Sequence, residues 1–498
     1  MRRRMCIQMD NKFLQGLKND QNYTYTENGG VTHKTTNSYV LDYFSQGSAF
    51  RNRSIEDIVK VFSKSYATDT LLTMKILFNS RDVRGGNGER KVFRNLINWM
   101  AKNETETMRK NIANIPFFGR WDDLYALFDT PLENEALALI KKQLDKDINT
   151  DTPSLLGKWL KSENASSVES KELAARTRKA LGMSPKQYRK MLSSLRRKID
   201  ILETKLTEVE YSKIDYDKIP SKAGLKYKQA FLRHDATRYE AFIEQVNQGK
   251  KKINTQTLFP YEVIRDVMST RVTAQLKALE AMWYNLPDYI GDNDTDTIAV
   301  VDVSGSMWGT PIQMAISLGL YLAERNKGAF RNHFITFSSN PQLVEVVGNN
   351  LKTKVENIER ADWGGSTNID ATFDLILNTA IKNNLSQDEI PSRIVIISDM
   401  EFDSAEGNSY WSTRNKKTNF DLIKEKFKRN GYEMPKLIFW NVDSRNDNAP
   451  MTMNERGVQL VSGASPRLFE YILQDKFLSA YDLMLEVLNQ ERYNIITV

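Results

Sequence analysis

Residues 297–307 read TIAVVDVSGSM, and this stretch decides the fold of the C-terminal part of the chain. The apolar and β-branched run IAVV is followed directly by Asp302, Ser304 and Ser306. A short continuous apolar run is typical of a strand buried inside a parallel sheet. Ligands of open α/β sheets bind at the carboxyl ends of such strands. We therefore expect the D-x-S-x-S loop to lie at the functional edge of an α/β domain.

Two later segments carry the same kind of side chain. Thr367 ends the glycine-rich stretch WGGST and precedes a predicted helix over residues 369–383. Residues 392–399 read SRIVIISD and predict a second continuous apolar strand, which ends in the carboxylate of Asp399. Because the carboxyl ends of parallel strands share one edge of the sheet, these loops are expected to converge. The predicted metal ligands are Asp302, Ser304, Ser306, Thr367 and Asp399.

This predicted set contains two carboxylates and three hydroxyls, without histidine or cysteine. Oxygen ligands of this kind suit a hard cation that keeps some of its waters, so Mg²⁺ or Mn²⁺ is expected before zinc. The set is too small to complete an octahedron, which leaves a position for a partner's carboxylate or for a phosphate. The alternative is a Ser/Asp-rich loop that caps a helix and binds no metal.

The region 297–465 resembles a von Willebrand factor A domain with an intact metal-ion-dependent adhesion site. The family's three motif parts occur in order, as DVSGS at 302–306, Thr367 and Asp399. The resemblance implies a Rossmann-like α/β fold that binds Mg²⁺ (or Mn²⁺) and takes an acidic side chain from a protein partner. Further strands are predicted at residues 333–337, 343–347, 435–443 and 458–463, and closing helices at 466–498.

Composition bounds the rest of the 498-residue chain. Its length predicts a multidomain protein, and 40% hydrophobic residues are enough to build cores. The single cysteine, Cys6, excludes an intramolecular disulfide and a cysteine-based zinc site. No apolar stretch approaches the length of a membrane span, and the basic start of the chain lacks the apolar region of a signal peptide. We expect a cytoplasmic monomer that does not contact membranes.

Charge is divided unevenly along the chain. Residues 1–290 contain 49 Lys and Arg against 35 Asp and Glu, a net charge of +14. Residues 291–498 contain 21 against 28, a net charge of −7. Positive charge concentrated on one domain attracts polyanions, although a solvated basic surface without a partner would have the same composition.

The N-terminal half is predicted to be all-α. Residues 1–35 are expected to be irregular, 36–288 to form a basic helical domain, and 289–296 to be a linker. The clearest helical pattern begins at Ser184 and continues as a heptad-like seam to Val209. The succession of helices fits HEAT-like repeats in a solenoid or ring, although no repeat period can be fixed.

Two segments of this half have the composition of a nucleic-acid contact. The turn RDVRGGNGER at 81–90 joins two predicted helices, and a helix starting near Glu89 could offer its amides to phosphate. Residues 220–239 interleave cations with aromatics, as single-stranded nucleic acid favours. Each could equally be a plain turn or an amphipathic helix. The candidate contacts are Arg81, Arg84, Arg90, Lys91, Arg94, Arg120, Arg196, Arg197, Arg233, His234 and Arg238.

A basic helical half joined to a von Willebrand A-like half resembles the TROVE-type proteins, the Ro ribonucleoproteins. It is most similar to a related family of bacteria, viruses and plants, through RDVRGGNGER, IPFFGRWDDLY and AFLRHDATRYEAF. The resemblance implies a ring of helical repeats that binds small structured or single-stranded RNA without catalysis.

The alternative function is a metal-dependent protein-interaction scaffold that binds no RNA. An enzyme is not expected. Aspartyl phosphatases need a second aspartate two positions after the nucleophile, and Ser304 stands there in this chain. The three histidines are scattered and suggest no general base.

Overall fold

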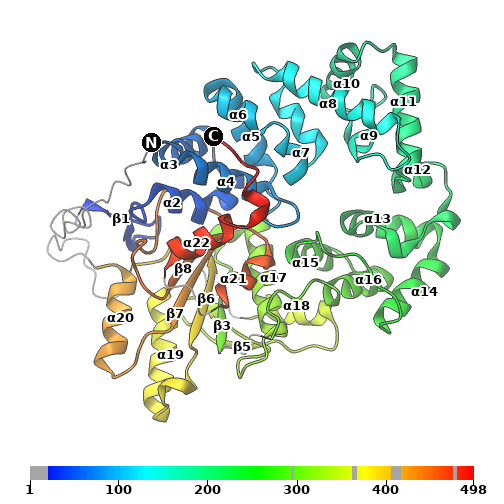
Figure 1. Cartoon of the computed structure of the whole chain (residues 1–498). Coiled ribbons are helices and arrows are strands. Elements are labelled where there is room, and N and C mark those ends of the chain that lie inside the picture. The colour runs from blue at the N-terminus through cyan, green and yellow to red at the C-terminus, as the bar shows by residue number, and fades with distance from the viewer. Residues whose placement is uncertain (1–20, 293–295, 362–366, 405–416, 475–478) are drawn as a thin grey trace.

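The computed structural model describes residues 21–292, 296–361, 367–404, 417–474 and 479–498. Helices fill most of the chain up to Tyr284, and an α/β region begins at Thr297 (Figure 1). The predicted helical N-terminal region and α/β C-terminal region are therefore confirmed. Residues 1–20 of the predicted irregular segment and 293–295 of the predicted linker lie outside the described residues.

The helical region is a succession of short α-helices. They are α2 (Tyr39–Gln46), α3 (Ile55–Thr68), α4 (Thr70–Arg81), α5 (Lys91–Asn103), α6 (Thr105–Asn111), α7 (Asn114–Phe118), α8 (Glu133–Ile148), α9 (Leu156–Trp159), α10 (Val168–Ala180), α11 (Pro185–Lys198), α12 (Leu202–Thr207), α13 (Ser221–His234), α14 (Ala236–Asn247), α15 (Pro260–Ser269) and α16 (Thr273–Tyr284).

The predicted seam from Ser184 to Val209 is not one helix. Ser184 caps α11 as its sequence suggests, with a reciprocal contact to Gln187. The helix then ends at Lys198, and Asp200 turns the chain in the left-handed region at φ 54° before α12 begins. The apolar spacing continues across this break although the two helices bury their apolar residues in different cores, so spacing alone does not reveal the turn.

The C-terminal region contains a six-stranded sheet. All six predicted strands are present: β3 (Thr297–Asp302), β4 (His333–Phe337), β5 (Leu343–Glu345), β6 (Arg393–Ser398), β7 (Lys436–Asn441) and β8 (Val458–Ser462). Their order is β5-β4-β3-β6-β7-β8, and every pair is parallel except β4 with β5. The described helices of this region are α17 (Thr310–Arg325), α18 (Leu351–Glu359), α19 (Ile369–Asn383), α20 (Asn419–Arg429), α21 (Phe469–Ile472) and α22 (Ala480–Leu488).

A glycine sets the closest contact between α17 and the centre of the sheet. A Cβ atom at Gly319 would lie 2.5 Å from the Cγ2 atom of Val301, a distance that real side chains do not adopt. Val301 immediately precedes Asp302, so this tight packing holds the end of β3 against the helix that follows its loop.

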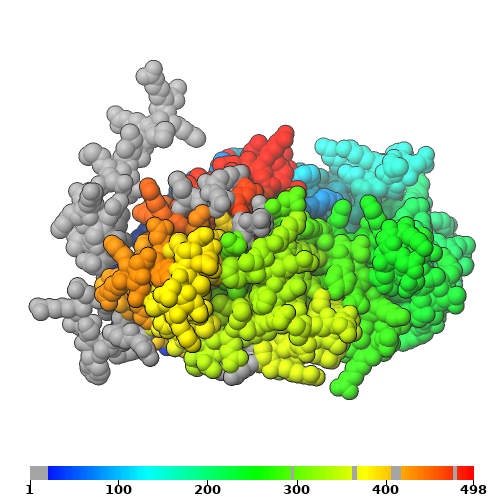
Figure 2. Space-filling model, turned by 90° about the horizontal axis from the view of Figure 1, so that it is seen from below, coloured from blue at the N-terminus to red at the C-terminus, as the bar shows by residue number. Residues whose placement is uncertain are grey.

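The helical region is seated on the α/β region at both of its ends. At one end, α2 and the 3₁₀ helix η1 (Gly47–Asn52) pack against edge strand β8, beside α22 (Figure 1). At the other end, α15 packs on α17 and α18. The space-filling view shows the green helices and the yellow-green elements after them meeting side by side (Figure 2). One hydrophobic core runs through both regions, and a smaller second core lies among α12, α13, α14 and α16.

Residues 1–35 were predicted to be irregular, and this is wrong for residues 23–33. Strands β1 (Tyr23–Tyr25) and β2 (Val31–His33) form an antiparallel hairpin. The backbone of His33 exchanges two hydrogen bonds with Ala449, of 3.1 and 2.9 Å. The hairpin therefore packs on the α/β region, which follows it by more than 250 residues in the sequence.

The last residues of the chain pack on the predicted phosphate-binding turn. Asp82 of that turn is fully buried, and its carboxylate accepts hydrogen bonds from Arg492 Nη2 at 2.9 Å and from the Tyr493 hydroxyl at 3.1 Å. Asn79 also donates to the Tyr493 hydroxyl, at 2.8 Å. The turn therefore connects two parts of the protein that are about 400 residues apart in the sequence.

Replacing Arg492 by alanine leaves the buried Asp82 carboxylate without its cation. We expect Arg492→Ala to lower the free energy of unfolding by roughly 2–4 kcal/mol. Arg429→Ala is the control, because Arg429 is 76% exposed in its pair with Glu425, and we expect it to cost at most about 0.5 kcal/mol. Urea denaturation measures both variants, and equal effects would contradict the role given to Arg492.

Candidate metal centre

The two predicted carboxylates lie at the ends of neighbouring strands, since Asp302 is the last residue of β3 and Asp399 follows β6. Val301 pairs with Ile397 in the parallel register of β3 and β6, so Asp302 and Asp399 leave the sheet at the same edge. Asp302 is fully buried and Asp399 is 1% exposed. The structure thus places both predicted carboxylates at one edge of the sheet.

The D-x-S-x-S loop folds around the carboxylate of Asp302. The Ser304 amide donates to Oδ1 at 2.9 Å, and the Ser398 hydroxyl donates to Oδ2 at 2.7 Å. The hydroxyls of Ser304 and Ser306 are hydrogen-bonded to each other, with their oxygens 3.0 Å apart. Two ligands at right angles around Mg²⁺, each about 2.1 Å from the ion, are also about 3 Å apart. These two hydroxyls are therefore spaced as adjacent ligands of one ion.

The charges at this edge are incompletely balanced. Burial and the neighbouring carboxylate of Asp399 raise the pKa of Asp302. Arg445 Nη2 donates to Asp399 at 2.8 Å, and the Glu401 amide donates to the other oxygen of Asp399 at 3.1 Å. Among the described residues no cation pairs with Asp302. A divalent cation beside Asp302 would remove the repulsion that the two carboxylates now exert.

Thr367 lies at the same edge, where its hydroxyl already has partners. Its Oγ1 is 2.8 Å from the Glu401 carbonyl oxygen and 3.0 Å from Asp403 Oδ1, and it accepts a 2.9 Å hydrogen bond from Asn28. One lone pair of the hydroxyl remains for a cation. The other residues of the stretch WGGST, 363–366, lie outside the described residues.

The donor set fits a hard cation, with one obstacle. Within the described ranges, no group of three or more His, Cys, Asp or Glu side chains is placed to share a metal. A site built from two carboxylates and hydroxyls suits Mg²⁺ or Mn²⁺ better than zinc. The obstacle is Arg445, whose guanidinium holds the Asp399 carboxylate.

Sequence reasoning missed four residues of this site. Glu27, Asn28, Glu401 and Arg445 all contact it or its immediate neighbours. Burial raises the pKa of Glu401, whose carboxylate accepts from the Glu27 amide and from two asparagines. None of these residues belongs to the motif, and two come from the opposite end of the chain.

Four of the predicted nucleic-acid contacts are buried or half-buried and have internal partners. Arg81 is 2% exposed, and its guanidinium pairs with the buried Asp123 at 2.7 Å. The residues that share such engagement are Arg81, Arg94, Arg120 and Arg196, which hold Asp122, Asp123 or backbone carbonyls. Arg81 in particular does not lie on the surface. Its place in the predicted set is corrected to a structural one, since exposing it would leave Asp123 unpaired.

The other predicted contacts are exposed. They are Arg84, Arg90, Lys91, Arg197, Arg233, His234 and Arg238. The guanidinium of Arg238 nevertheless donates to the Tyr211 and Ile214 carbonyl oxygens, at 2.9 and 2.8 Å, and pairs with Asp235. The helix N-terminus that was predicted to bind phosphate is already occupied, because Glu89 Oε1 accepts from the Lys91 amide at 2.9 Å. Burial and the nearby Arg120 and Arg94 lower the pKa of Arg90, so three guanidinium groups lie near one another here.

Comparison with known proteins assigns the chain to a family. Residues 26–178 and 146–289 match the family described as "Domain of unknown function (DUF2828)". An uncharacterized protein of Acanthamoeba polyphaga mimivirus is 31% identical over 512 residues, which cover 94% of this chain and 87% of the viral protein. The chain belongs to the DUF2828 family.

The C-terminal part of this DUF2828-family protein, residues 296–494, also matches "Domain of unknown function (DUF7788)". A distant similarity links the chain to the crystal structure of the Deinococcus radiodurans RO (RSR) protein, with 15% identity and a TM-score of 0.35. That alignment covers 88% of this chain and 94% of the other. In the described part of the family member, no helix is long and apolar enough to cross a membrane.

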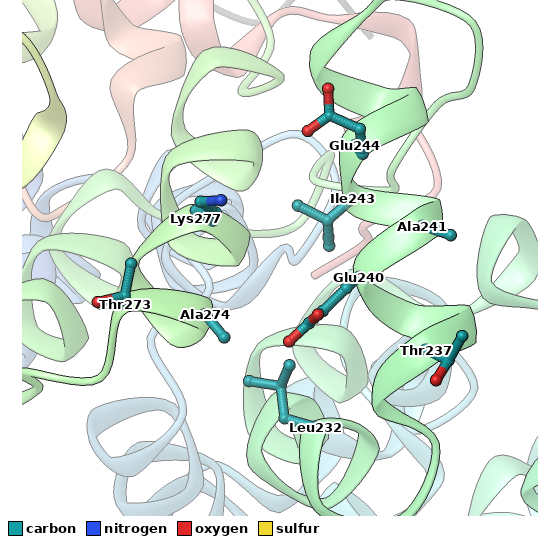
Figure 3. A pocket seen from close by; sticks show the side chains of 9 residues that line it. All are labelled: Leu232, Thr237, Glu240, Ala241, Ile243, Glu244, Thr273, Ala274 and Lys277. Carbon is teal, nitrogen blue, oxygen red and sulfur yellow. The ribbon is translucent and has the colours of Figure 1, made fainter.

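A cavity of about 620 Å³ lies away from the metal centre, between α13, α14 and α16. Figure 3 shows Glu240 and Ile243 of α14 facing Lys277 of α16, with Leu232 of α13 nearby. Glu240 and Glu244 give this cavity two carboxylates against one lysine. Such a lining repels phosphate, so the cavity does not extend the predicted nucleic-acid surface.

Crowding of the two carboxylates has a consequence for stability. In EDTA at pH 7.5 we expect Asp302→Asn to raise the free energy of unfolding by roughly 1–2 kcal/mol, because one of two adjacent buried charges is removed. Asp370→Asn is the matched control. Asp370 is equally buried but pairs with Lys426 at 2.9 Å, so its replacement should lower stability by roughly 1 kcal/mol. Denaturant unfolding compares the variants, and a loss of stability in both contradicts the crowding.

Proposed function

We propose that this protein is a non-catalytic binding protein whose C-terminal region is a von Willebrand A-type domain. In this proposal the domain holds Mg²⁺ (or Mn²⁺) at the edge formed by β3 and β6, and the ion binds an acidic side chain of a protein partner. The observation that carries the proposal is the 3.0 Å spacing of the Ser304 and Ser306 hydroxyls beside two buried, adjacent carboxylates.

The residues would divide the work by chemistry. Ser304, Ser306 and Thr367 would supply neutral oxygens, and Asp302 and Asp399 would balance the charge of the ion. When bound, the ion supplies a positive centre with an open position for a carboxylate. Hydrolysis is not part of the proposal, because Ser304 occupies the position of the second aspartate of aspartyl phosphatases.

Metal titration tests the site. We expect Mg²⁺ or Mn²⁺ to stabilise the wild-type protein in a saturable manner, reaching about 2.7 kcal/mol at one hundred times the Kd. Asp302→Ala should abolish this effect, and Asp388→Ala, which removes an exposed carboxylate of the same region, should leave it intact. Thermal unfolding and calorimetric titration measure both. A wild-type protein that ignores the ions, or an Asp302→Ala variant that responds normally, would refute the site.

RNA binding by the helical region is the second proposed activity. It is supported by the net charge of +14 on residues 1–290 and by the exposed cations beside the turn at 81–90. Because the acidic C-terminal region carries −7, the attraction for RNA would be confined to the helical region. If RNA does not bind, the alternative is a metal-dependent scaffold for proteins alone.

Charge reversal separates these possibilities. We expect the pair Arg90→Glu and Lys91→Glu to weaken binding of single-stranded RNA at least about tenfold at low salt, and to flatten the dependence of the Kd on salt. The pair Lys428→Glu and Arg429→Glu is the control, because it reverses two adjacent exposed cations of the α/β region. Fluorescence anisotropy at several salt concentrations measures both pairs. Equal losses would show that only net charge matters, and the proposed surface would be wrong.

A further inference from the structure

The tip of the β1–β2 hairpin lies on the rim of the metal centre. Asn28 Nδ2 donates to the Thr367 hydroxyl at 2.9 Å and to the Glu401 carbonyl oxygen at 2.7 Å. The Ser404 hydroxyl donates to the Gly29 carbonyl oxygen at 3.0 Å. The hairpin thus contacts a proposed ligand and the loop that follows the second carboxylate.

The tip fits this rim closely. A Cβ atom at Gly30 would lie 2.5 Å from the Phe402 carbonyl oxygen, so only glycine allows this approach. The Thr26 hydroxyl donates to the same Phe402 oxygen at 2.5 Å. The base of the hairpin is held separately, through His33 and Ala449. The tip and the base of the hairpin are therefore held by separate sets of contacts.

An arginine connects the hairpin tip to the second carboxylate. The guanidinium of Arg445 lies between Asp399 and Glu27, and each ion-pair distance is 2.8 Å. Asn446 also donates to the Glu27 carboxylate, at 2.8 Å. The order carboxylate, cation, carboxylate is the order that a divalent ion and an acidic ligand would produce at Asp399. Here the protein's own residues supply all three charges.

We propose that the β1–β2 hairpin is the intramolecular occupant of the metal centre, and that its tip competes with a divalent cation and the acidic ligand of that cation. This inference rests on the metal site proposed above. An ion that binds Asp399 competes with Arg445 for that carboxylate. Release of Arg445 breaks the link to Glu27 and weakens docking of the tip. Coupling between two bound states is reciprocal, so docking of the tip must lower the affinity for the ion.

Manganese binding to the full-length protein tests the competition. Electron paramagnetic resonance of free Mn²⁺ gives the Kd of the wild type and of each variant. We expect Arg445→Gln to bind Mn²⁺ about tenfold more tightly and Asn28→Ala about threefold more tightly. Asn28→Ala changes no charge, so it reports on docking of the tip and not on electrostatic repulsion. Arg456→Gln is the charge control. Arg456 is exposed and lies just before β8, at the amino ends of the parallel strands and therefore away from the metal centre. The Kd of this variant for Mn²⁺ should equal that of the wild type.

Hydrogen exchange follows the hairpin itself. The Glu27 amide donates to Glu401 Oε2 at 2.7 Å and should exchange slowly while the tip is docked. We expect Mg²⁺ to accelerate exchange across the tip, residues 26–30, in the wild type and to have no effect in Asp302→Ala.

The outcomes separate the two ideas. If Mn²⁺ binds through Asp302 but Arg445→Gln, Asn28→Ala and the exchange rates match the wild type, the hairpin is a fixed part of the fold. The competition is then overturned while the metal centre stands. If neither the wild type nor Arg445→Gln binds Mn²⁺, the metal centre fails, and the competition with it. Binding that appears only in Arg445→Gln or Asn28→Ala supports the competition most directly.

Discussion

The metal centre depends on two buried carboxylates at the ends of paired strands, whose negative charges the neighbouring residues must balance. The parallel register of β3 and β6, in which Val301 pairs with Ile397, brings Asp302 and Asp399 out at the same edge of the sheet. Neither carboxylate is solvated, so each must be balanced from within the protein. The Ser398 hydroxyl, the amides of Ser304 and Glu401, and the guanidinium of Arg445 share that task. A single divalent cation could replace most of these contacts to the two carboxylates, which makes the site suited to metal binding.

The ends of the chain are interlocked across the two regions. The hairpin at residues 23–33 packs on the α/β region, whereas the last residues pack back on the helical region. The Asn111 side chain donates to the Thr497 carbonyl oxygen at 2.6 Å, beside the contacts that Arg492 and Tyr493 make to Asp82. With the contacts of α2 and α15, these attachments join both regions into one core. Neither region can be removed without exposing buried surface of the other.

Charge counted along the sequence differs from charge on the surface. The helical region has a large excess of cations, but some of these cations pair with buried aspartates inside the protein. Arg81 and Arg94 hold the buried Asp123, and Arg120 pairs with Asp122 while its guanidinium lies 3.9 Å from the centre of the Trp159 ring. These arginines stabilise the junction between α4, α5 and the 3₁₀ helix η2 (Trp121–Leu127). Only the exposed cations are available to a partner, and they are fewer than the net charge of the helical region suggests.

The sequence by itself determined the six strands, the helix over 369–383 and the carboxylates that end the central strands. These features depend on local patterns, such as a continuous apolar run or a motif that follows it at once, and a buried parallel strand imposes such patterns on its own residues. Only the tertiary structure decided that Arg81 is internal, that Arg445 holds Asp399, and that the tip at Glu27 and Asn28 lies over the site. Those contacts join residues up to several hundred positions apart. Their partners carry no shared local pattern, since packing of whole elements, and not the residues beside them in the chain, brings them together.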